Sequence, residues 1–580
     1  MILQALHRYY IRKQDEMPPE GFDQKEIPFL IVLDLEGNFV DLQDTRTLFG
    51  KKMLARKFVV PRENERSGKN AWQITNVLWD HYGYVLGWPK SDTEKDRNTA
   101  LKQHGVFVEQ VETLRKAFPD DEEILAVLSF LTGGRYDDVY AHPSWKDCAK
   151  IPGCNLSFQM SGLNRLICEN KNVQSFISGA SCEEEQEEGN ESPDIAGICL
   201  ITGEHSSLAR LHPRTPIAGS KSNAKIVSFQ KNMGFDSYGK QQSFNAPVCK
   251  SASFSYATAL RHMLTKDSRQ KLMVGDATTV FWAEKKHDIE DVFADIFGEP
   301  AKDNPVQDYK ALVAMFRAPQ IGAKAELDPG TRFYVLGLAP NAARIAVRFW
   351  YEGTVAQVSD NIYKHFEDCS IVHGPNQMEV LSLFRLLVST ATQGKSENIQ
   401  PNLTGDFMRS ILSGTPYPKT LLSAAVRRIR AEREITYPRA ALVKAVLARE
   451  SRYYKQNTKE VGMALETSND NIGYRMGRLF ATLEKIQEEA SPGINATIRD
   501  RFYGAASSTP VAVFSHLMKL KNHHLSKLEN RGRAINFERL IGEIMDDIND
   551  FPSHLSLADQ GRFAVGYYHQ RQDFFTKKDQ

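Results

Sequence analysis

The stretch from Cys199 to Leu264 combines the residue types that bind nucleic acid. Between His205 and Lys266 the sequence has nine Lys or Arg residues and a single acid, Asp236. Aromatic rings lie among these cations, and Gly, Ser and Asn in the gaps let the backbone approach a ligand closely. Cations suit phosphates, and flat rings suit bases. The alternative is a long surface loop that its aromatic side chains anchor to a core. The candidate contact residues are Lys221, Ser222, Asn223, Lys225, Lys231 and Lys240.

A second candidate is a polar loop that ends a basic segment near the N-terminus. Residues 46–69 hold eight Lys or Arg residues against Glu63 and Glu65, and the segment runs into RENERSGKNAW. Asn and Lys side chains can hydrogen-bond base edges, and a neighbouring ring can wedge or stack. We therefore expect this loop to contact nucleic acid, the alternative being a surface turn with its tryptophan in the core. The residues concerned are Arg66, Lys69, Asn70 and Trp72.

Two further cationic stretches lie in the C-terminal part of the sequence. Residues 419–455 hold ten Lys or Arg residues against three Glu, in a pattern of two helices broken at Pro438. Residues 463–580 hold fifteen cations and fifteen acids, but several cations crowd one helix and its exit. We expect one basic face there that guides a nucleic-acid strand. Its candidate residues are Arg475, Arg478, Lys519, Lys521, Lys527 and Arg531.

The spacing of the metal-binding residue types is unfavourable for a metal site. The seven cysteines are widely spaced without a CxxC pair, and Cys182, Cys199, His205 and His212 do not fit a zinc-finger pattern. Asp276 has no second carboxylate or histidine at metal spacing. We expect neither a metal nor another cofactor, and we expect reduced, mostly buried thiols.

Composition and charge limit how the chain can work. The formal net charge is +1, so any affinity for nucleic acid must come from local patches. The first residues, MILQALHRYYIRK, lack the apolar centre of a signal peptide, and no stretch is long enough to cross a membrane. We therefore expect a cytoplasmic protein without membrane contact.

The pattern of elements predicts an α+β protein of several domains. IPFLIVLDLEGNFVDL indicates a hairpin with a turn at Glu36-Gly37-Asn38, and RFYVLGLAPNAARIAVRFW indicates two strands joined by Ala339-Pro340-Asn341. From about residue 376 the period becomes helical. The predicted organisation is a mixed, largely antiparallel region with hairpins over 1–375, a basic helical connector over 376–458 and a C-terminal four-helix bundle over 459–580.

Helical signals are clearest near the C-terminus. From Phe537 to Ile548 the apolar residues recur at helical spacing and form one continuous stripe. Thr509-Pro510 predicts a helix start, with the helix extending through Leu528. Ser556, with Asp559 three residues later, resembles a capping box for the last helix.

Several long motifs resemble one protein family and together cover nearly the whole chain. They are CLITGE…ARLHP, FDSYGKQQSFNAPV, RFYVLGLAPNAARIAVRFW, GYRMGRLFATLEKIQ and FPSHLSLADQGRFAVGYYHQRQDFF. The chain resembles the large subunit of the type I-C CRISPR Cascade complex. The resemblance implies a non-catalytic subunit that recognises the protospacer-adjacent motif in duplex DNA, helps open the duplex and guides the displaced strand. Guide RNA then supplies sequence specificity by base pairing.

The resemblance also implies partners. These are a guide-RNA complex with backbone and guide-end-binding subunits, a recruited helicase–nuclease, and a small subunit that matches the chain's own C-terminal bundle. In this family the bundle is also made alone from an internal start. Here Lys459-Glu460-Val461 can be encoded as a purine-rich ribosome-binding site before Met463, which gives a product of 118 residues, Met463–Gln580. Met476 is a poorer start because it would remove part of the first bundle helix.

Two other classes of function stay open. A nuclease of the same system would need paired carboxylates or a His/Asp cluster to hold a metal. His523-His524 has no acid beside it, and Glu529 lies among Lys and Arg residues with which it can pair. A pure assembly scaffold would instead direct its cations toward guide RNA or partner subunits.

Overall fold

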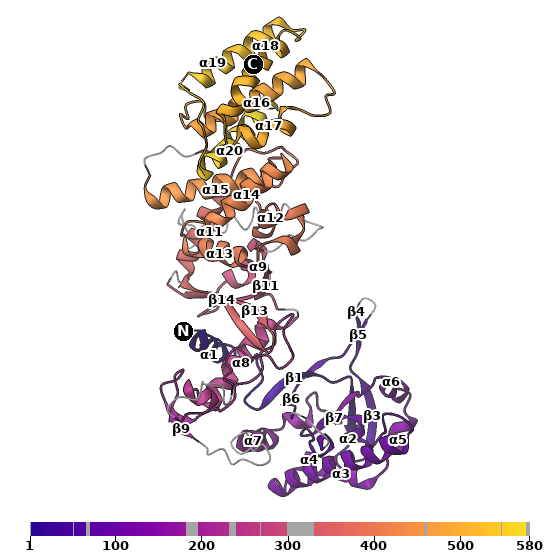
Figure 1. Ribbon diagram of the computed structural model, residues 1–580. Helices are drawn as coiled ribbons and strands as arrows, with labels where there is room; N and C mark the ends of the chain where they lie inside the picture. Colours follow the sequence, from indigo (N-terminus) through magenta and orange to yellow (C-terminus); the bar gives the residue numbers. More distant parts are fainter. Residues whose placement is uncertain are drawn as a thin grey trace. The chain divides into compact units, whose positions relative to one another are not determined.

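The computed structural model shows a chain with two compact units (Figure 1). Unit 1 contains Met1–Arg12, Arg210–Asn245 and Ala259–Gln580, and unit 2 contains Lys13–Ala209 and Ala246–Thr258. The predicted α+β class is confirmed, because antiparallel strands and hairpins precede a helical C-terminal region. The boundaries near 375 and 458 stay a prediction, since both lie within unit 1. The residues described are 2–49, 52–64, 66, 70–180, 195–230, 239–266, 268–275, 277–297, 330–456, 461–546 and 548–575.

Unit 2 is built around a four-stranded sheet with the order β3-β2-β8-β7. Strand β2 pairs with β3 in antiparallel and with β8 in parallel orientation, and β7 is antiparallel to β8. The predicted turn between β2 and β3 is confirmed. Gly37 has φ +82°, and a Cβ there would lie 2.5 Å from the carbonyl oxygen of Ala126, so the turn requires glycine. The strands are β2 (Phe29–Leu33), β3 (Phe39–Asp44), β7 (Trp79–His81) and β8 (Asn155–Met160).

Helices and three two-stranded sheets complete unit 2. The side chains of Thr93 and Asp121 accept backbone N–H groups at the starts of α3 and α4, and both helices pack into the hydrophobic core. The two-stranded sheets are β1 (Phe22–Glu26) with β6 (Lys57–Pro61), β4 (Thr47–Phe49) with β5 (Lys52–Leu54), and β9 (Ala196–Ile198) with β10 (His205–Ser207). The helices are α2 (Tyr82–Val85), α3 (Glu94–Ala117), α4 (Glu122–Gly133), α5 (Asp137–Ala141), α6 (Trp145–Lys150) and α7 (Lys171–Ala180), and α8 (Lys250–Leu264) continues into unit 1.

Unit 1 contains an antiparallel sheet with the order β11-β12-β13-β14. The predicted hairpin is present, but its turn lies further along the chain than expected. Asn341 still pairs with Arg344, so the reversal occurs at Ala342 and Ala343, with φ +52° at Ala342. The strands are β11 (Lys271–Val274), β12 (Ala277–Ala283), β13 (Arg332–Asn341) and β14 (Arg344–Thr354).

The helices of unit 1 share one extended hydrophobic core. The break between α14 and α15 is confirmed: Arg433 ends α14 in the left-handed region, and Pro438 lies in the first turn of α15. The helices are α1 (Ile2–Arg12), α9 (Ile289–Phe297), α11 (Val355–Cys369), α12 (Leu383–Val388), α13 (Pro401–Ser413), α14 (Lys419–Glu432), α15 (Tyr437–Tyr454), α16 (Ile472–Ala490), α17 (Ile498–Ala506), α18 (Val511–Leu525), α19 (Arg531–Met545) and α20 (Leu557–Phe575).

The C-terminal bundle has five helices in its described residues, α16 to α20, instead of the predicted four. The additional helix is α17. A capping box between Thr497 and Asp500 stabilises its start. The helix predicted from Pro510 through Leu528 is α18, which ends at Leu525. The predicted apolar stripe lies on α19 as far as Met545, and Ile548 follows the end of this helix. At the start of α20 the Ser556 hydroxyl donates to Asp559 Oδ2 at 2.7 Å and accepts the Asp559 N–H at 3.2 Å.

Glycines allow the central helices α16 and α20 to pack backbone against backbone. A Cβ at Gly477 would overlap the carbonyl oxygen of Phe563, and a Cβ at Gly566 would overlap that of Tyr474. Helix α20 also packs on α14 and α15, where a Cβ at Gly561 would lie 3.1 Å from Val443 Cγ1. The bundle therefore shares its core with the preceding helices.

Candidate nucleic-acid interface

The loop of unit 2 that carries Arg66 is held from within the protein. Arg66 Nε donates to the carbonyl oxygen of Ile74 at 2.8 Å, and its Nη2 forms an ion pair with Asp80. The guanidinium lies 4.3 Å from the centre of the Tyr84 ring. These contacts hold Arg66 to Ile74, Asp80 and Tyr84 within unit 2.

Asp80 is the buried centre of this arrangement. Its Oδ2 accepts the Asn76 N–H at 3.0 Å and the Thr75 hydroxyl at 3.3 Å, and its Oδ1 accepts the His81 N–H at 2.8 Å. The side chain is 2% exposed. A buried carboxylate is tolerated only when hydrogen-bond donors or a cation compensate its charge. The contacts of Asp80 therefore hold Arg66 against the segment from Thr75 to His81.

The same loop presents Asn70 to solvent. Asn70 precedes the short 3₁₀ helix η1 (Ala71–Gln73), is exposed, and does not use its side chain to cap that helix. Trp72 is half-buried, with Lys102 Nζ 5.4 Å from its ring centre, and the Tyr84 hydroxyl donates to the Ala71 carbonyl at 3.1 Å. The prediction for Lys69 falls outside the described residues. Asn70 therefore lies at the surface, next to a segment that Arg66 and Tyr84 hold at Ile74 and Ala71.

In unit 1, the turn from Lys221 to Ala224 sits on the tip of the β13–β14 hairpin. The Lys221 N–H donates to the carbonyl oxygen of Ala342 at 3.2 Å, and the Ala224 N–H donates back to Lys221 at 3.0 Å. Lys221, Ser222 and Asn223 are all exposed. Three of the predicted contact residues thus lie side by side on a turn with a fixed base.

Lys225 follows this turn and pairs with Arg344 in a parallel bridge. Burial, together with the charge of Lys225, lowers the pKa of His212 to about 4, so this imidazole is neutral at pH 7. Arg344 is exposed and was not among the predicted contacts, although its place at a hairpin tip was visible in the sequence. Lys240 is exposed but lies on a separate segment before the 3₁₀ helix η3 (Gln242–Asn245), and Lys231 falls outside the described residues.

The prediction that Arg475 and Arg478 contact a DNA strand is wrong. Arg475 is 5% exposed, and its guanidinium donates to the carbonyl oxygens of Asn469 at 3.0 Å and Ile544 at 3.2 Å. Arg478 is 1% exposed and donates to Gln570 Oε1 at 3.1 Å. Burial lowers the pKa of Arg478. Both side chains hold α16 against neighbouring elements of the bundle.

The remaining predicted cations lie at the end of α18 and the start of α19. Lys519, Lys527 and Arg531 are exposed. Lys521 is half-buried, and its Nζ lies 3.9 Å from a carboxylate oxygen of Glu538. The structure thus leaves three exposed cations for a ligand on this part of the bundle surface.

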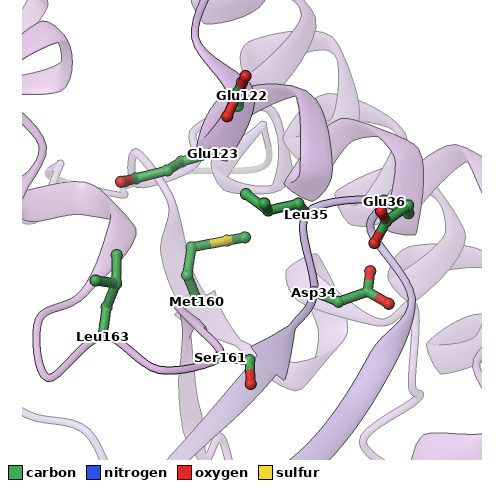
Figure 2. Close-up of a pocket in the computed structure, with 8 residues that line it drawn as sticks. All are labelled: Asp34, Leu35, Glu36, Glu122, Glu123, Met160, Ser161 and Leu163. Carbon is green, nitrogen blue, oxygen red and sulfur yellow. The ribbon is translucent and has the colours of Figure 1, made fainter.

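A pocket of about 460 Å³ in unit 2 is lined by acidic side chains, unlike the cationic surfaces described above (Figure 2). Figure 2 shows Glu123 on one side of it and Asp34 and Glu36 on the other. Glu123 is paired with Arg165. Carboxylates repel phosphates, so this pocket does not extend the cationic surface. Its other lining residues are Leu35, Glu122, Met160, Ser161 and Leu163.

The described ranges contain neither a cluster of metal-binding side chains nor a helix suited to a membrane. No group of three or more His, Cys, Asp or Glu residues there could hold a metal ion. No helix in this part of the chain is long and apolar enough to cross a membrane. The six cysteines that the structure describes are free and buried, as expected. The seventh, Cys182, lies outside the described ranges.

Comparison with known protein families identifies the class and the family to which this chain belongs. The sequence profile of a family of CRISPR-associated proteins, Cas_Csd1, matches residues 6–575. No curated protein matches the chain. Because the match covers nearly the whole sequence, the chain belongs to the Cas_Csd1 family. This membership supports a subunit of a Cascade-type complex, the class that the sequence motifs resemble.

Proposed function

We propose that this chain is the non-catalytic large subunit of a type I-C CRISPR surveillance complex. It recognises the protospacer-adjacent motif in duplex DNA, helps unwind the duplex, stabilises the displaced strand and helps recruit the helicase–nuclease. Family membership supports the complex. The observation that supports motif reading is the exposed Asn70, which directly precedes a segment that Tyr84 holds at Ala71 and Arg66 holds at Ile74.

Asn70 has the chemistry of a base reader. An asparagine amide carries a donor and an acceptor and can bond the edge of an adenine in the major groove. A reader must be held in position, because loose side chains lose entropy on binding. The contacts of Arg66 with Ile74, Asp80 and Tyr84 provide that support, and Trp72 flanks the reader with a half-buried ring.

The exposed turn at Lys221, Ser222 and Asn223 supplies the duplex contacts in this proposal. Lys221 offers a cation to phosphate, and the two short polar side chains offer hydrogen bonds to phosphate oxygens. Lys225 and Lys240 extend this set. On the bundle, Lys519, Lys527 and Arg531 take the role of guiding the displaced strand, which needs a cationic track without sequence preference.

In this proposal the C-terminal bundle is also synthesised in the cytoplasm as a separate, shorter protein that starts at Met463. In the full chain the Met463 carbonyl accepts the Val372 N–H at 2.7 Å, and α20 packs on α14 and α15. The separate product would lack those helices and would expose that face of α20. A silent recoding of codons 459–461 should abolish the small product, and undiminished synthesis would refute the internal start.

Photo-crosslinking tests the proposal directly. A reconstituted guide-loaded complex is bound to a target duplex that carries a photoreactive base within the flanking motif. We expect adducts on peptides of this chain that contain Asn70 or the turn at Lys221. Adducts confined to other subunits would assign motif reading elsewhere and leave this chain as an assembly scaffold. DNA cleavage by the purified chain with magnesium or manganese would instead support a nuclease.

A further inference from the structure

The hairpin of β4 and β5, here called the β4–β5 arm, stands apart from the core of unit 2. It forms a two-stranded sheet of its own. Figure 1 shows it extending away from the sheet and helices of its unit. Isolated two-stranded hairpins are marginally stable in water and need a hydrophobic face packed against something else. Among the residues that the structure describes, no other strand of the unit pairs with the arm.

Aliphatic side chains cover both faces of the arm. Leu48 is directly opposite Met53, so these two side chains share one face, whereas Leu54, opposite Thr47, points to the other. Leu48 is 71% exposed, Met53 49% and Leu54 45%. None of the three belongs to the hydrophobic core of unit 2. Clustered exposed aliphatic groups mark an interaction surface.

The base of the arm is firmly attached to the body of the unit. The Thr45 hydroxyl donates to the Pro28 carbonyl at 3.1 Å, and the Arg56 carbonyl accepts the Ile27 N–H at 3.2 Å. The guanidinium of Arg46 lies 4.6 Å from the centre of the Phe29 ring. A fixed base holds the arm in a defined direction, which lowers the entropy cost of docking.

The charges at the base indicate the chemistry of the partner. From Arg46 to Lys57 the sequence has five cations and no acid. Arg46 is already paired with Asp44 at 2.7 Å, whereas Arg56 and Lys57 are exposed. A complementary surface has an apolar groove for the aliphatic groups and acidic side chains beside the base. The exposed side chains that the structure describes on the arm are aliphatic, and aliphatic groups gain most from burial in an apolar groove of a protein.

We propose that the β4–β5 arm inserts into an apolar, acid-rimmed groove of another protein subunit and anchors this chain in its complex. The inference goes beyond the proposed function, because it requires a multi-subunit complex but not motif reading. Burial of Leu48 and Met53 in that groove supplies the main gain in affinity.

Assembly of the full chain with the guide RNA and the other subunits tests this inference. In the double variant Leu48→Ser, Met53→Ser we expect at least about tenfold weaker incorporation, measured by mass photometry, because two buried aliphatic groups are lost. The urea midpoint of the isolated chain should not change, since both residues are exposed. The matched control is Leu101→Ser, which removes a leucine that is 65% exposed on α3 and should assemble normally.

Two outcomes would overturn the inference. One is unchanged incorporation of the double variant; the other is normal incorporation with weakened target-DNA binding, which would place nucleic acid on the arm. A photo-crosslinker in place of Met53, Met53→p-benzoylphenylalanine, gives a second readout that does not depend on the stability of the serine variant. The inference requires adducts with a protein subunit, and adducts only with RNA or DNA would contradict it.

Discussion

Arg66 and Asp80 form an ion pair between a loop that carries an exposed asparagine and a strand in the core of unit 2. The carboxylate is 2% exposed and the guanidinium 21%. Removing one partner of a buried pair leaves the other charge without compensation, which costs more than the pair itself contributes. The pair therefore connects the stability of unit 2 to the placement of Asn70.

The first prediction concerns this pair. Arg66→Gln should lower the free energy of unfolding by about 3 kcal/mol, because Asp80 loses its cation while it stays buried. Urea unfolding measures the change. The matched control is Arg97→Gln, which breaks the exposed pair between Arg97 and Asp92 and should cost less than about 1 kcal/mol. Equal effects of the two substitutions would show that the Arg66–Asp80 pair has no special structural role.

Asn70→Ala should reduce the preference of the complex for the correct flanking motif. A good bidentate contact to a base discriminates by about 1–3 kcal/mol, so the ratio of dissociation constants for scrambled and correct flanks should fall about 5- to 150-fold. Binding titrations on two duplexes that differ only in the flank measure this ratio. Gln73→Ala, an exposed amide three residues away, is the control. An unchanged ratio in Asn70→Ala refutes the assignment.

Lys221→Ala should weaken duplex binding by the complex equally for all sequences. Loss of one phosphate contact should flatten the plot of log affinity against log salt by about one unit, and Lys221→Ala with Lys225→Ala should flatten it further. The control is Lys116→Ala, an exposed cation at the end of α3. If the slope stays the same in the Lys221 variants, these lysines are only solvated.

Gly477→Ala should destabilise the bundle by about 3 kcal/mol, because the new methyl group would overlap the backbone of α20. Gly542→Ala is the opposite control, since a Cβ there meets nothing within 4 Å. This substitution in α19 should stabilise by up to about 1 kcal/mol through helix propensity. Thermal unfolding of both variants measures the difference. A neutral Gly477→Ala would contradict the close packing of α16 and α20.

The stability of the bundle should fall at acidic pH partly through His569. Burial, together with the charge of Lys444, lowers the pKa of His569 to about 3, against 6.5 in an unfolded chain. Below pH 6.5 the unfolded state binds the proton and the folded state does not, so stability is lost as the pH falls. Between pH 7 and pH 5 this histidine should account for about 2 kcal/mol. His569→Asn should lose that part of the pH dependence in urea unfolding, and identical pH profiles would refute it.

The elements that have strong local signals in the sequence were predicted correctly. The turn at Gly37 and the start of α20 at Ser556 were correct, because a glycine in a tight turn and a serine that accepts a backbone N–H of the first helical turn act within a few residues. The turn after Asn341 was misplaced, since Ala342 adopts a left-handed φ that no local signal announces. Helix α17 was missed because it is short and lies between two stronger helices.

The candidate site was less predictable because burial depends on distant residues. Arg475 and Arg478 are cations on an amphipathic helix, but their partners Ile544 and Gln570 come from much later in the chain. The pair of Arg66 with Asp80 joins residues that are fourteen positions apart, so no local pattern predicted it. Asn70 and Lys221 lie in polar loops and are exposed as expected.

The most direct measurement of motif reading compares the guide-loaded complex with and without this chain. Both forms are titrated with duplexes that share one target sequence and carry either the correct or a scrambled flank. We expect a clear preference for the correct flank only when the chain is present. If the same preference persists without the chain, another subunit reads the motif and the central proposal is wrong.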